Sequence, residues 1–328
     1  MTTDPANLPP VLRPQNPPAH RLADLAAHLG APIEQRVGGG DQDADTDASA
    51  SVTGLTLATA DLRPGDLFVA VQGGTRHGAE FADDAAARGA VAVVTDAAGR
   101  ERALASGLPT IVVPDPRGSL GALSAWVYAT GPNDTLPILF GTTGTNGKTS
   151  VSHLLEGILT QLGVTAGLSS TAERHIAGDV IVSRLTTPEA YEMHALLALM
   201  RERGVEAVAI EVSAQALSRQ RVDGIVFDVA GFTNLSHDHL DDYADMAEYF
   251  QAKLPLFRPD RSRRAVICLD SASGADVVAA CEVPYVTIGT PAIAAAPDAA
   301  AAADWTVEIL DELPDGTRFR LSGPGGRS

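Results

Sequence analysis

The sequence predicts an α/β protein in which a small N-terminal α/β domain is followed by a P-loop NTPase-like domain, a mostly parallel sheet flanked by helices. Three observations support this fold class. Segments typical of strands alternate with segments typical of helices along most of the chain. A glycine-rich stretch, 141–150, lies between an apolar strand pattern and a helical pattern. Apolar runs rich in β-branched residues, such as 207–212, are typical of buried parallel strands.

The composition is that of a globular protein. The chain has 328 residues, of which 45% are hydrophobic, and its net charge of −17 argues against nucleic acid or an anionic membrane as the main partner. No apolar run approaches the ~20 residues of a membrane span, and the N-terminus lacks the basic and apolar segments of a secretory signal. The two cysteines, Cys268 and Cys281, fit reduced thiols. We expect a cytoplasmic protein without membrane insertion, and a monomer.

The first part of the chain predicts a tail and one small domain. Residues 1–19 are rich in proline and are expected to form a disordered tail. Residues 20–134 are expected to form the N-terminal domain, and the polar segment 38–51 within it a flexible loop. Strands are predicted at 52–57, 66–71, 91–95 and 110–113. Helices are predicted at 20–29, 79–88, 100–106 and 119–128.

Residues 135–328 are expected to form the second domain, beginning with a strand at 136–140. A helix should follow the glycine-rich stretch, because apolar residues recur there at helical spacing: Val151, Leu154, Leu155, Ile158, Leu159 and Leu162. Thr187 is expected to cap a helix that runs from Pro188 to Arg203. The remaining expectations are strands at 180–183, 207–212, 225–233 and 264–269, a poorly packed alanine-rich loop at 292–303, a hairpin at 305–310 and 317–321, and an unpacked end at 323–328.

The stretch 141–150 has the layout of a phosphate-binding loop: a strand, a glycine-rich turn, Lys-Thr and a helix. Lys148 would reach the β- and γ-phosphates of ATP, and the Thr149 hydroxyl would bind Mg²⁺, while the helix N-terminus adds its dipole. The chain departs from the strict Walker pattern at position 142, where the pattern requires glycine and this chain has threonine. The alternative interpretation is therefore a chance glycine-rich turn. The predicted ATP-binding residues are Gly144, Thr145, Asn146, Gly147, Lys148, Thr149 and Ser150.

Three further residues are weighed as parts of a metal site. Glu211 ends an apolar run, and the carboxyl end of a parallel strand is where α/β sheets bind ligands, so we expect it to bind Mg²⁺ rather than face solvent. His239 lies in an acidic segment that is either a second cation site or a solvated loop. Lys253 lies in a helix predicted at 245–254, where a solvated side chain is the ordinary expectation.

These residues belong to motifs that resemble the Mur ligases, the ATP-dependent amide-forming enzymes of peptidoglycan synthesis. GTNGKT at 144–149 is similar to their ATP loop. Five segments together resemble the MurE type, which adds the third peptide residue to UDP-N-acetylmuramoyl-L-alanyl-D-glutamate: EVS at 211–213, RVDG at 221–224, FTNLS at 232–236, DHLD at 238–241 and YFQAK at 249–253. LTTPE at 185–189 is similar to the segment that holds the muramoyl dipeptide, and LRPGDLFVA at 62–70 with HG at 77–78 to the uridine-nucleotide domain.

The resemblance implies roles for individual residues. Lys148 and Thr149 would bind ATP and its Mg²⁺, and Glu211 and His239 would bind metal. Lys253 would be carbamylated by CO₂, which turns a cation into an anion able to help hold a second Mg²⁺. Catalysis would then depend on Lys148, Lys253 and His239. The residues implied to bind the UDP-muramoyl dipeptide are Thr59, His77, Thr186, Thr187, Ser213 and Arg221.

The sequence departs from the family pattern in several places. Family members commonly have Asp-Ser-Arg at 58–60, Ser-His at 214–215 and Arg at 237, where this chain has Ala-Thr-Ala, Ala-Gln and His. The family also has a C-terminal domain that completes the ATP site and selects the amino acid. Because the 328 residues stop before such a domain, we expect them to bind the UDP-muramoyl dipeptide, and ATP more weakly, without forming an amide bond at a useful rate.

The resulting interpretation is an ATP-dependent carboxylate–amine ligase of cell-wall synthesis. The γ-phosphate of ATP would pass to the side-chain carboxylate of D-glutamate, and the amine of a diamino acid would displace it. A ligase that adds D-Ala-D-Ala and a folylpolyglutamate synthase are the alternatives within the family, and a non-catalytic nucleotide-binding protein is the alternative from another class. Whether the diamino acid is meso-diaminopimelate, L-lysine or another stays open.

Overall fold

The computed structural model describes residues 11–35, 49–183, 185–237, 242–314 and 316–327. The chain divides into two compact units. The first unit comprises residues 1–135, 189–202 and 223–225, and the second comprises 136–188, 203–222 and 226–328. The helix predicted from Pro188 was expected in the second domain, whereas this helix, α7 (Ala190–Glu202), belongs to the first unit.

The first unit is built on a five-stranded sheet within the described residues, with strand order β2-β7-β6-β5-β4. β4, β5, β6 and β7 are parallel, and β2 is antiparallel to β7. A separate ribbon pairs β1 with β3. The strands are β1 (His20–Arg21), β2 (Ile33–Glu34), β3 (Ser51–Val52), β4 (Gly54–Thr56), β5 (Asp66–Ala70), β6 (Ala92–Thr95) and β7 (Thr110–Val112).

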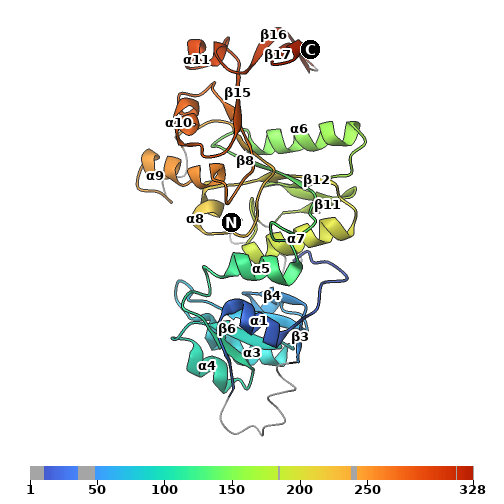
Figure 1. Cartoon of the computed structure of the whole chain (residues 1–328), viewed down its shortest axis with the longest axis vertical. Helices are drawn as coiled ribbons and strands as arrows, with labels where there is room; N and C mark the ends of the chain where they lie inside the picture. The colour runs from blue at the N-terminus through green and yellow to red at the C-terminus, as the bar shows by residue number, and fades with distance from the viewer. Residues whose placement is uncertain (1–10, 36–48, 184, 238–241, 315, 328) are drawn as a thin grey trace. The chain divides into compact units, whose positions relative to one another are not determined.

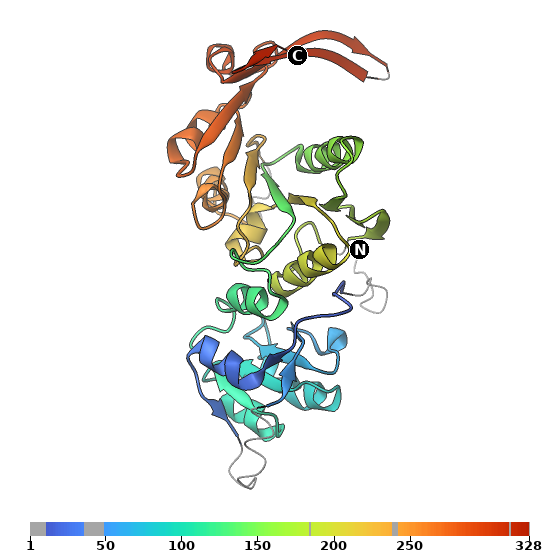
Figure 2. The same ribbon diagram turned by 45° about the vertical axis from the view of Figure 1, so that its right-hand side comes forward.

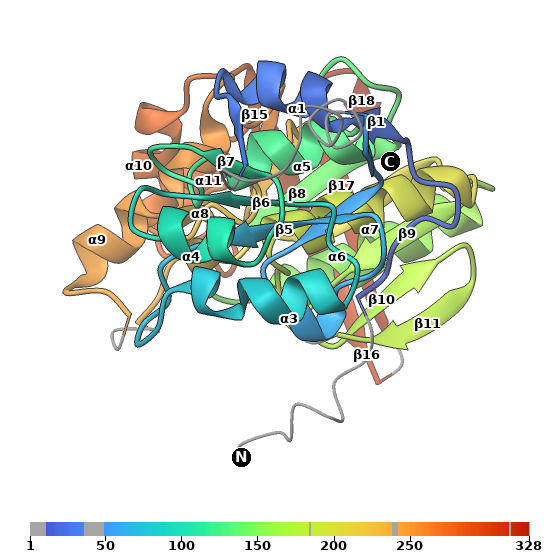
Figure 3. The same ribbon diagram turned by 90° about the horizontal axis from the view of Figure 1, so that it is seen from below.

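Helices cover both faces of this sheet, as Figure 3 shows, with α3 (Ala82–Ala87) and α4 (Arg100–Ala105) on one face and α1 (Leu22–Leu29) and α5 (Leu120–Tyr128) on the other. Two clusters of buried side chains match these two layers. Apolar side chains of α7 join the cluster that contains α1 and α5, which is why this helix belongs to the first unit. Two short 3₁₀ turns, η2 (Thr59–Asp61) and η3 (Gly78–Phe81), complete the unit.

The N-terminal segment contradicts the expectation of disorder over the part that the structure describes. Val11 and Arg13 are buried. The Arg13 guanidinium donates to both carboxylate oxygens of Asp66, at 2.7 and 2.6 Å, and to the carbonyl oxygens of Leu55 and Asp61. Proline content indicated disorder, but one arginine with four acceptors fastens the segment to the sheet. Residues 1–10 and most of the predicted loop 38–51 lie outside the described residues.

The second unit is built on an eleven-stranded sheet within the described residues, with order β11-β10-β9-β12-β8-β13-β14-β15-β16-β17-β18. The strands from β9 to β16 in this order are parallel, and the outer strands at both ends are antiparallel. The strands are β8 (Ile138–Thr143), β9 (Ala166–Ser169), β10 (Glu173–Ile176), β11 (Asp179–Val182), β12 (Ala207–Glu211), β13 (Val229–Phe232), β14 (Ala265–Cys268), β15 (Tyr285–Gly289), β16 (Trp305–Leu313), β17 (Gly316–Gly323) and β18 (Gly326–Arg327). The predicted α/β class with a mostly parallel second sheet is therefore confirmed.

The longest helix of the second unit, α6 (Lys148–Gln161), follows β8 directly (Figure 1). Its apolar stripe predicted the helix but stays largely outside: Leu154 is 66% and Leu162 74% exposed. The small side chain of Ser152 is the buried one. The other helical segments are α8 (Ala214–Ser218), α9 (Met246–Gln251), η4 (Leu254–Phe257), α10 (Ser273–Ala280) and α11 (Pro297–Ala301). Among the described residues, no helix has the length and hydrophobicity of a membrane span.

The C-terminal region confirms one expectation and corrects two. The predicted hairpin is present as the long antiparallel ribbon of β16 and β17 (Figure 2). The alanine-rich segment 292–303 is not a loop throughout, because it forms α11 with Ala300 fully buried. Close packing explains this, since a Cβ at Gly289 would lie 2.4 Å from the Ala300 carbonyl oxygen. The chain end is also paired, because β18 lies antiparallel to β17.

Candidate functional site

The predicted phosphate loop lies between the end of β8 and the start of α6. Gly147 precedes the helix with a φ of 82°, a left-handed conformation that glycine adopts without strain. Among the residues that the structure describes, no side chain caps the N-terminus of α6. The N–H groups of its first turn, from Lys148 onward, have no intrahelical acceptor and the helix dipole favours negative charge there. The arrangement suits a phosphate group.

Gly144 is required by a close approach as well as by its φ of 145°. A Cβ at this position would lie 2.0 Å from Thr233 Oγ1 and 3.0 Å from the Asn234 carbonyl oxygen. The loop therefore packs directly on the segment that follows β13. Gly144 marks the place where two ends of neighbouring strands meet, because β13 pairs with β8 in the sheet.

The segment after β13 fastens the loop through a set of hydrogen bonds. The N–H of Thr145 donates to the Asn234 carbonyl oxygen at 2.9 Å, and the N–H of Asn146 donates to Asn234 Oδ1 at 3.0 Å. Thr233 Oγ1 donates to the Asn146 carbonyl oxygen at 2.7 Å, and Asn146 Nδ2 donates to Ser236 Oγ at 3.0 Å. These bonds occupy the N–H groups of Thr145 and Asn146, so within the predicted phosphate loop the N–H groups of the first turn of α6 are the ones left for an anion. These contacts come from the family-like motif 232–236, of which no residue was predicted as a site residue.

The sequence contains only two lysines, and the structure brings both to this loop. Lys148 Nζ donates to the carbonyl oxygens of Gly144 at 3.1 Å and Thr145 at 2.7 Å. Lys253 Nζ donates to the same Gly144 carbonyl at 3.2 Å and lies 3.9 Å from the centre of the Tyr249 ring. Lys253 is 1% exposed, which corrects the ordinary expectation of a solvated lysine. It follows α9 rather than lying within it, because the helix ends at Gln251.

Glu211 ends β12, beside β8, and pairs in register with Thr142. Its side chain is fully buried. Both carboxylate oxygens accept hydrogen bonds from Thr171, which follows β9: the N–H donates to Oε1 at 3.2 Å and the hydroxyl to Oε2 at 2.8 Å. The alternative of a carboxylate that faces solvent is therefore wrong. Thr171 is a further residue of this region that the sequence patterns did not indicate.

The predicted dipeptide-binding residues of the second unit gather around Thr187. The Thr187 hydroxyl donates to the main-chain carbonyl of Glu211 at 2.9 Å and accepts from the N–H of Ser213 at 3.2 Å. Arg221 Nη1 donates to the Thr187 carbonyl oxygen at 3.4 Å. Thr187 was expected to cap a helix, but α7 begins only at Ala190, and the hydroxyl instead ties the segment to the end of β12. Ser213 caps α8 by accepting from the Ala216 N–H.

The two predicted residues of the first unit have partners within that unit. His77 is 8% exposed, and its Nδ1 accepts from the Ala79 N–H while Nε2 lies 3.1 Å from Asp96 Oδ1. A hydrogen bond from Thr59 lowers the pKa of the Asp84 carboxyl, with a further contribution from Arg88. A hollow of about 420 Å³ lies at the carboxyl ends of β6 and β7, and Asp96 lines it. His77 thus contacts a residue that lines this hollow, at the edge of the sheet where parallel strands bind ligands.

The donor set of the second unit fits a cation that arrives with a nucleotide. Mg²⁺ in such sites is usually held by one or two carboxylates together with substrate phosphates. Glu211 supplies a carboxylate beside the loop, and Thr149 supplies a hydroxyl in the first turn of α6. In the part of the chain that the structure describes, no three His, Cys, Asp or Glu side chains form a metal site by themselves. His239 lies outside the described residues.

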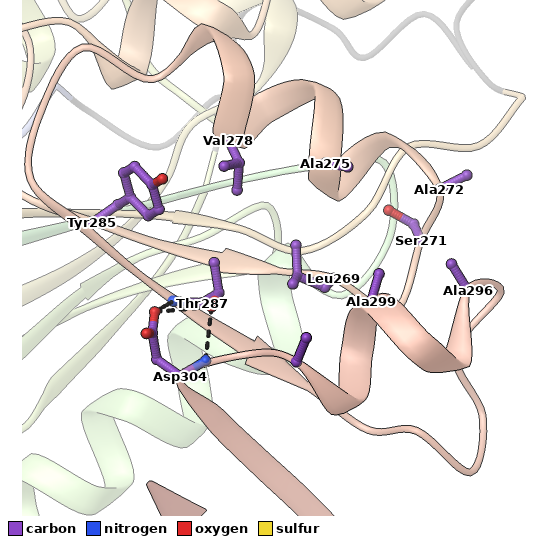
Figure 4. Close-up of a pocket in the computed structure, with 11 residues that line it drawn as sticks. Leu269, Ser271, Ala272, Ala275, Val278, Tyr285, Thr287, Ala296, Ala299 and Asp304 are labelled. Carbon is purple, nitrogen blue, oxygen red and sulfur yellow. Dashed lines mark hydrogen bonds between the residues drawn. The ribbon is translucent and has the colours of Figure 1, made fainter. Parts of the chain in front are cut away.

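Another hollow of about 420 Å³ lies away from these residues, between α10 and α11 (Figure 4). Alanines of both helices and Tyr285 of β15 line it. Its acidic residue, Asp304, accepts from the N–H and the hydroxyl of Thr287 at 2.8 and 2.9 Å, and these bonds lower the pKa of its carboxyl. Of the predicted site residues that the structure describes, none lines this hollow.

Comparison with known proteins gives two family matches. The Mur ligase middle domain matches residues 142–327, and the catalytic domain of the Mur ligase family matches residues 51–128. The UDP-N-acetylmuramyl-tripeptide synthetase of Leifsonia xyli is 54% identical over 319 residues, which are 97% of this chain and 58% of that protein. The UDP-N-acetylmuramoyl-L-alanyl-D-glutamate–2,6-diaminopimelate ligase of Streptomyces avermitilis is 44% identical over 312 residues, 95% of this chain and 57% of that protein. The chain thus spans less than two thirds of these relatives.

Solved structures share the fold at low sequence identity. A structure of a UDP-N-acetylmuramoyl-L-alanyl-D-glutamate–2,6-diaminopimelate ligase matches with a TM-score of 0.71 and 22% identity, covering 95% of this chain and 59% of its own. A MurF structure from Acinetobacter baumannii matches with a TM-score of 0.62 and 17% identity, covering 95% and 60%.

Proposed function

Because the chain belongs to the Mur ligase family, we propose that it carries the nucleotide and muramoyl sites of a MurE-type ligase of peptidoglycan synthesis. The reaction joins a diamino acid to the D-glutamate of UDP-N-acetylmuramoyl-L-alanyl-D-glutamate at the expense of ATP. The names of the relatives in Leifsonia and Streptomyces, a tripeptide synthetase and a diaminopimelate ligase, support this substrate class. The proposed location is the cytoplasm, where ATP is available.

One observation carries the proposal: the two lysines and one buried acid converge on the carboxyl edge of neighbouring strands. Lys148 and Lys253 both donate to Gly144, and Glu211 lies on the strand next to β8. A site with a loop for phosphate, the Lys148 cation, the Glu211 carboxylate and an amine at Lys253 that can take up CO₂ suits transfer of a phosphoryl group, where positioning and charge neutralisation supply most of the catalysis.

Each residue would have a defined task. The first turn of α6 and Lys148 hold the β- and γ-phosphates, and the 233–236 segment keeps the loop rigid. Thr186, Thr187, Ser213 and Arg221 orient the muramoyl dipeptide so that its carboxylate oxygen attacks the γ-phosphorus and ADP leaves. The diamino acid's amine then attacks the acyl carbon, phosphate leaves and the amine loses a proton.

The proposed site would also contain a metal ion and a modified lysine. Mg²⁺, held by Glu211, Thr149 and His239, would neutralise developing charge on the phosphates. A carbamate on Lys253 would supply a second anionic ligand to the metals. Uridine contacts fall to Thr59 and His77 in the first unit. The proposed state is a monomer.

Calorimetry tests the proposal with UDP-N-acetylmuramoyl-L-alanyl-D-glutamate and a non-hydrolysable ATP analogue as separate probes. The chain should bind both, and Lys148→Ala should lose the ATP analogue while keeping the uridine substrate. Phosphate release from ATP that depends on the muramoyl dipeptide would further distinguish a ligase from a nucleotide-binding protein without catalysis. Failure of the chain to bind the muramoyl dipeptide would contradict the proposal.

A further inference from the structure

Thr171 occupies a position in the second unit that links two groups of proposed site residues. Its N–H and hydroxyl engage both carboxylate oxygens of Glu211. Its Oγ1 also lies 3.1 Å from Thr186 Oγ1. Thr171 is therefore the residue through which a side chain on the dipeptide side touches the proposed metal ligand.

The chemistry of hydroxyl groups sets the direction of these bonds. A threonine hydroxyl has one proton and can accept two hydrogen bonds. The carboxylate is the stronger acceptor and the nearer one, so the proton of Thr171 points to Glu211 Oε2 at 2.8 Å. Thr186 Oγ1 is the second acceptor within reach of this donor, at 3.1 Å. The Thr171 hydroxyl is therefore the donor that links Thr186 to Glu211, and the two acceptors compete for its single proton.

The hydrogen bonds from Thr171 restrict the orientation of the Glu211 carboxylate. An ionised carboxylate offers about four acceptor positions, and Thr171 takes one on each oxygen. The remaining position on each oxygen is oriented by those two bonds. A buried carboxylate held in this way has one preferred orientation toward a ligand, and such supporting contacts are what fix a metal-binding side chain in place.

A second link runs in parallel through the main chain. Thr187 donates to the Glu211 carbonyl oxygen and accepts from Ser213. The neighbouring threonines 186 and 187 are thus tied to the side chain and to the main chain of the same glutamate. Whatever shifts this pair of threonines also shifts Glu211.

We propose that Thr171 is a positioning residue that couples occupancy of the Thr186–Thr187 segment to cation binding at Glu211. The inference rests on the proposed function, in which that segment holds the muramoyl dipeptide and Glu211 a divalent cation. Binding of the dipeptide engages the Thr186 hydroxyl and removes it as an acceptor, so the Thr171 proton stays on Glu211 and holds the carboxylate ready for the metal. By reciprocity, the metal then tightens binding of the dipeptide.

The test uses Mn²⁺ as the probe ion, with the ATP analogue present, followed by electron paramagnetic resonance. Mn²⁺ affinity is measured with and without UDP-N-acetylmuramoyl-L-alanyl-D-glutamate in wild type, Thr171→Val and Thr171→Ser. Valine keeps the shape but not the hydroxyl, and serine keeps the hydroxyl. Thr171 is exposed, so neither change disturbs the core, and equal melting temperatures verify this. Thr160→Val, an exposed threonine near the far end of α6, is the matched control.

Wild type, Thr171→Ser and Thr160→Val should bind Mn²⁺ more tightly when the dipeptide is present. Thr171→Val should bind Mn²⁺ roughly tenfold more weakly, the usual scale for losing one hydrogen bond to a charged group, and the dipeptide should no longer improve its affinity. Unchanged Mn²⁺ affinity and coupling in Thr171→Val would overturn the role of Thr171 and leave the proposed function standing. Wild type that binds no muramoyl dipeptide would overturn the proposed function and this inference together.

Discussion

The two units bury their charged side chains in different ways. In the first unit opposite charges meet: Arg13 and Asp66 are 5% and 2% exposed and lie 2.6 Å apart. In the second unit, Lys253 contacts a main-chain carbonyl and an aromatic face, and Glu211 is held by the N–H and hydroxyl of a threonine. A charge neutralised by its opposite serves the fold, whereas a carboxylate such as Glu211, held by the neutral donors of a threonine at a strand end, keeps capacity for a cation.

The largest effect expected from this contrast is on the stability of the first unit. Asp66→Ala leaves the Arg13 guanidinium buried without its counter-ion, and breaking a buried pair in this way costs ~3–5 kcal/mol. Denaturant unfolding of Asp66→Ala should show this loss, with Asp83→Ala, an exposed aspartate on α3, as the control. A loss no larger than that of the control would mean that this buried pair does not serve the fold.

The next effect is a pH dependence that comes from His194 on α7. Nδ1 lies 2.7 Å from Thr130 Oγ1, and Nε2 lies 2.9 Å from the Asp223 carbonyl oxygen. Burial lowers the pKa of His194 to about 4, against a smaller opposing effect of the bond to Asp223. As the pH falls, His194 is therefore protonated near pH 6.5 in the unfolded chain but only near pH 4 in the folded chain.

The stability that His194 contributes is thus complete above pH 6.5, declines as the pH falls toward about 4, and is then constant. The decline amounts to about 3 kcal/mol. His194→Gln, which can donate and accept at the same places, should flatten this part of the profile, whereas His28→Gln on the exposed side of α1 should not. Identical profiles for wild type and His194→Gln would show that another group titrates in this range.

The smallest of these effects concerns Arg221, whose Nη1 reaches the Thr187 carbonyl at 3.4 Å. An ammonium group cannot reproduce the planar fork that binds an anion through two parallel bonds. Arg221→Lys should raise the KM for the UDP-muramoyl dipeptide roughly tenfold, the scale of one charge-assisted hydrogen bond, and change the KM for ATP much less. Equal changes in both constants would remove Arg221 from the dipeptide site and weaken the contrast between the units.

Sequence patterns identified the features that depend on consecutive residues along the chain. The phosphate loop and Lys148 follow from strand, glycine and helix signals that are continuous along the chain. Glu211 followed from its place at the end of an apolar run. The strands β9 and β10 were missed because they are short and carry glycine, serine and charged residues rather than a clear alternation.

Sequence patterns could not predict contacts between residues that lie far apart along the chain. Thr171 meets Glu211 across 40 residues and Asn234 meets Asn146 across 88, because strand order places β9, β12, β8 and β13 side by side. Arg13 was overlooked for a different reason. Proline content describes a segment as a whole, while one arginine with its acceptors 42 to 53 residues away decides where that segment lies.

The role of Lys253 was implied by resemblance alone, and the structure places its amine at the phosphate loop. If a carbamate on Lys253 is needed, Lys253→Ala should lose roughly 10–100-fold in dipeptide-dependent phosphate release, the usual scale for removing support of a metal. A small carboxylate such as formate should restore part of it. Lys253→Arg should not be rescued, because it keeps a positive charge where an anion is needed. Full activity of Lys253→Ala without additive would refute the role.

The most direct measurement detects the modification itself. The sequence has two lysines, so a carbamate signal in a protein equilibrated with ¹³C-bicarbonate can come only from Lys148, Lys253 or the N-terminal amine. The ¹³C-NMR spectrum of wild type and of Lys148→Ala should contain a carbamate signal that is missing from Lys253→Ala. A spectrum in which Lys253→Ala keeps every carbamate signal of the wild type would contradict the account of Lys253 at the phosphate loop.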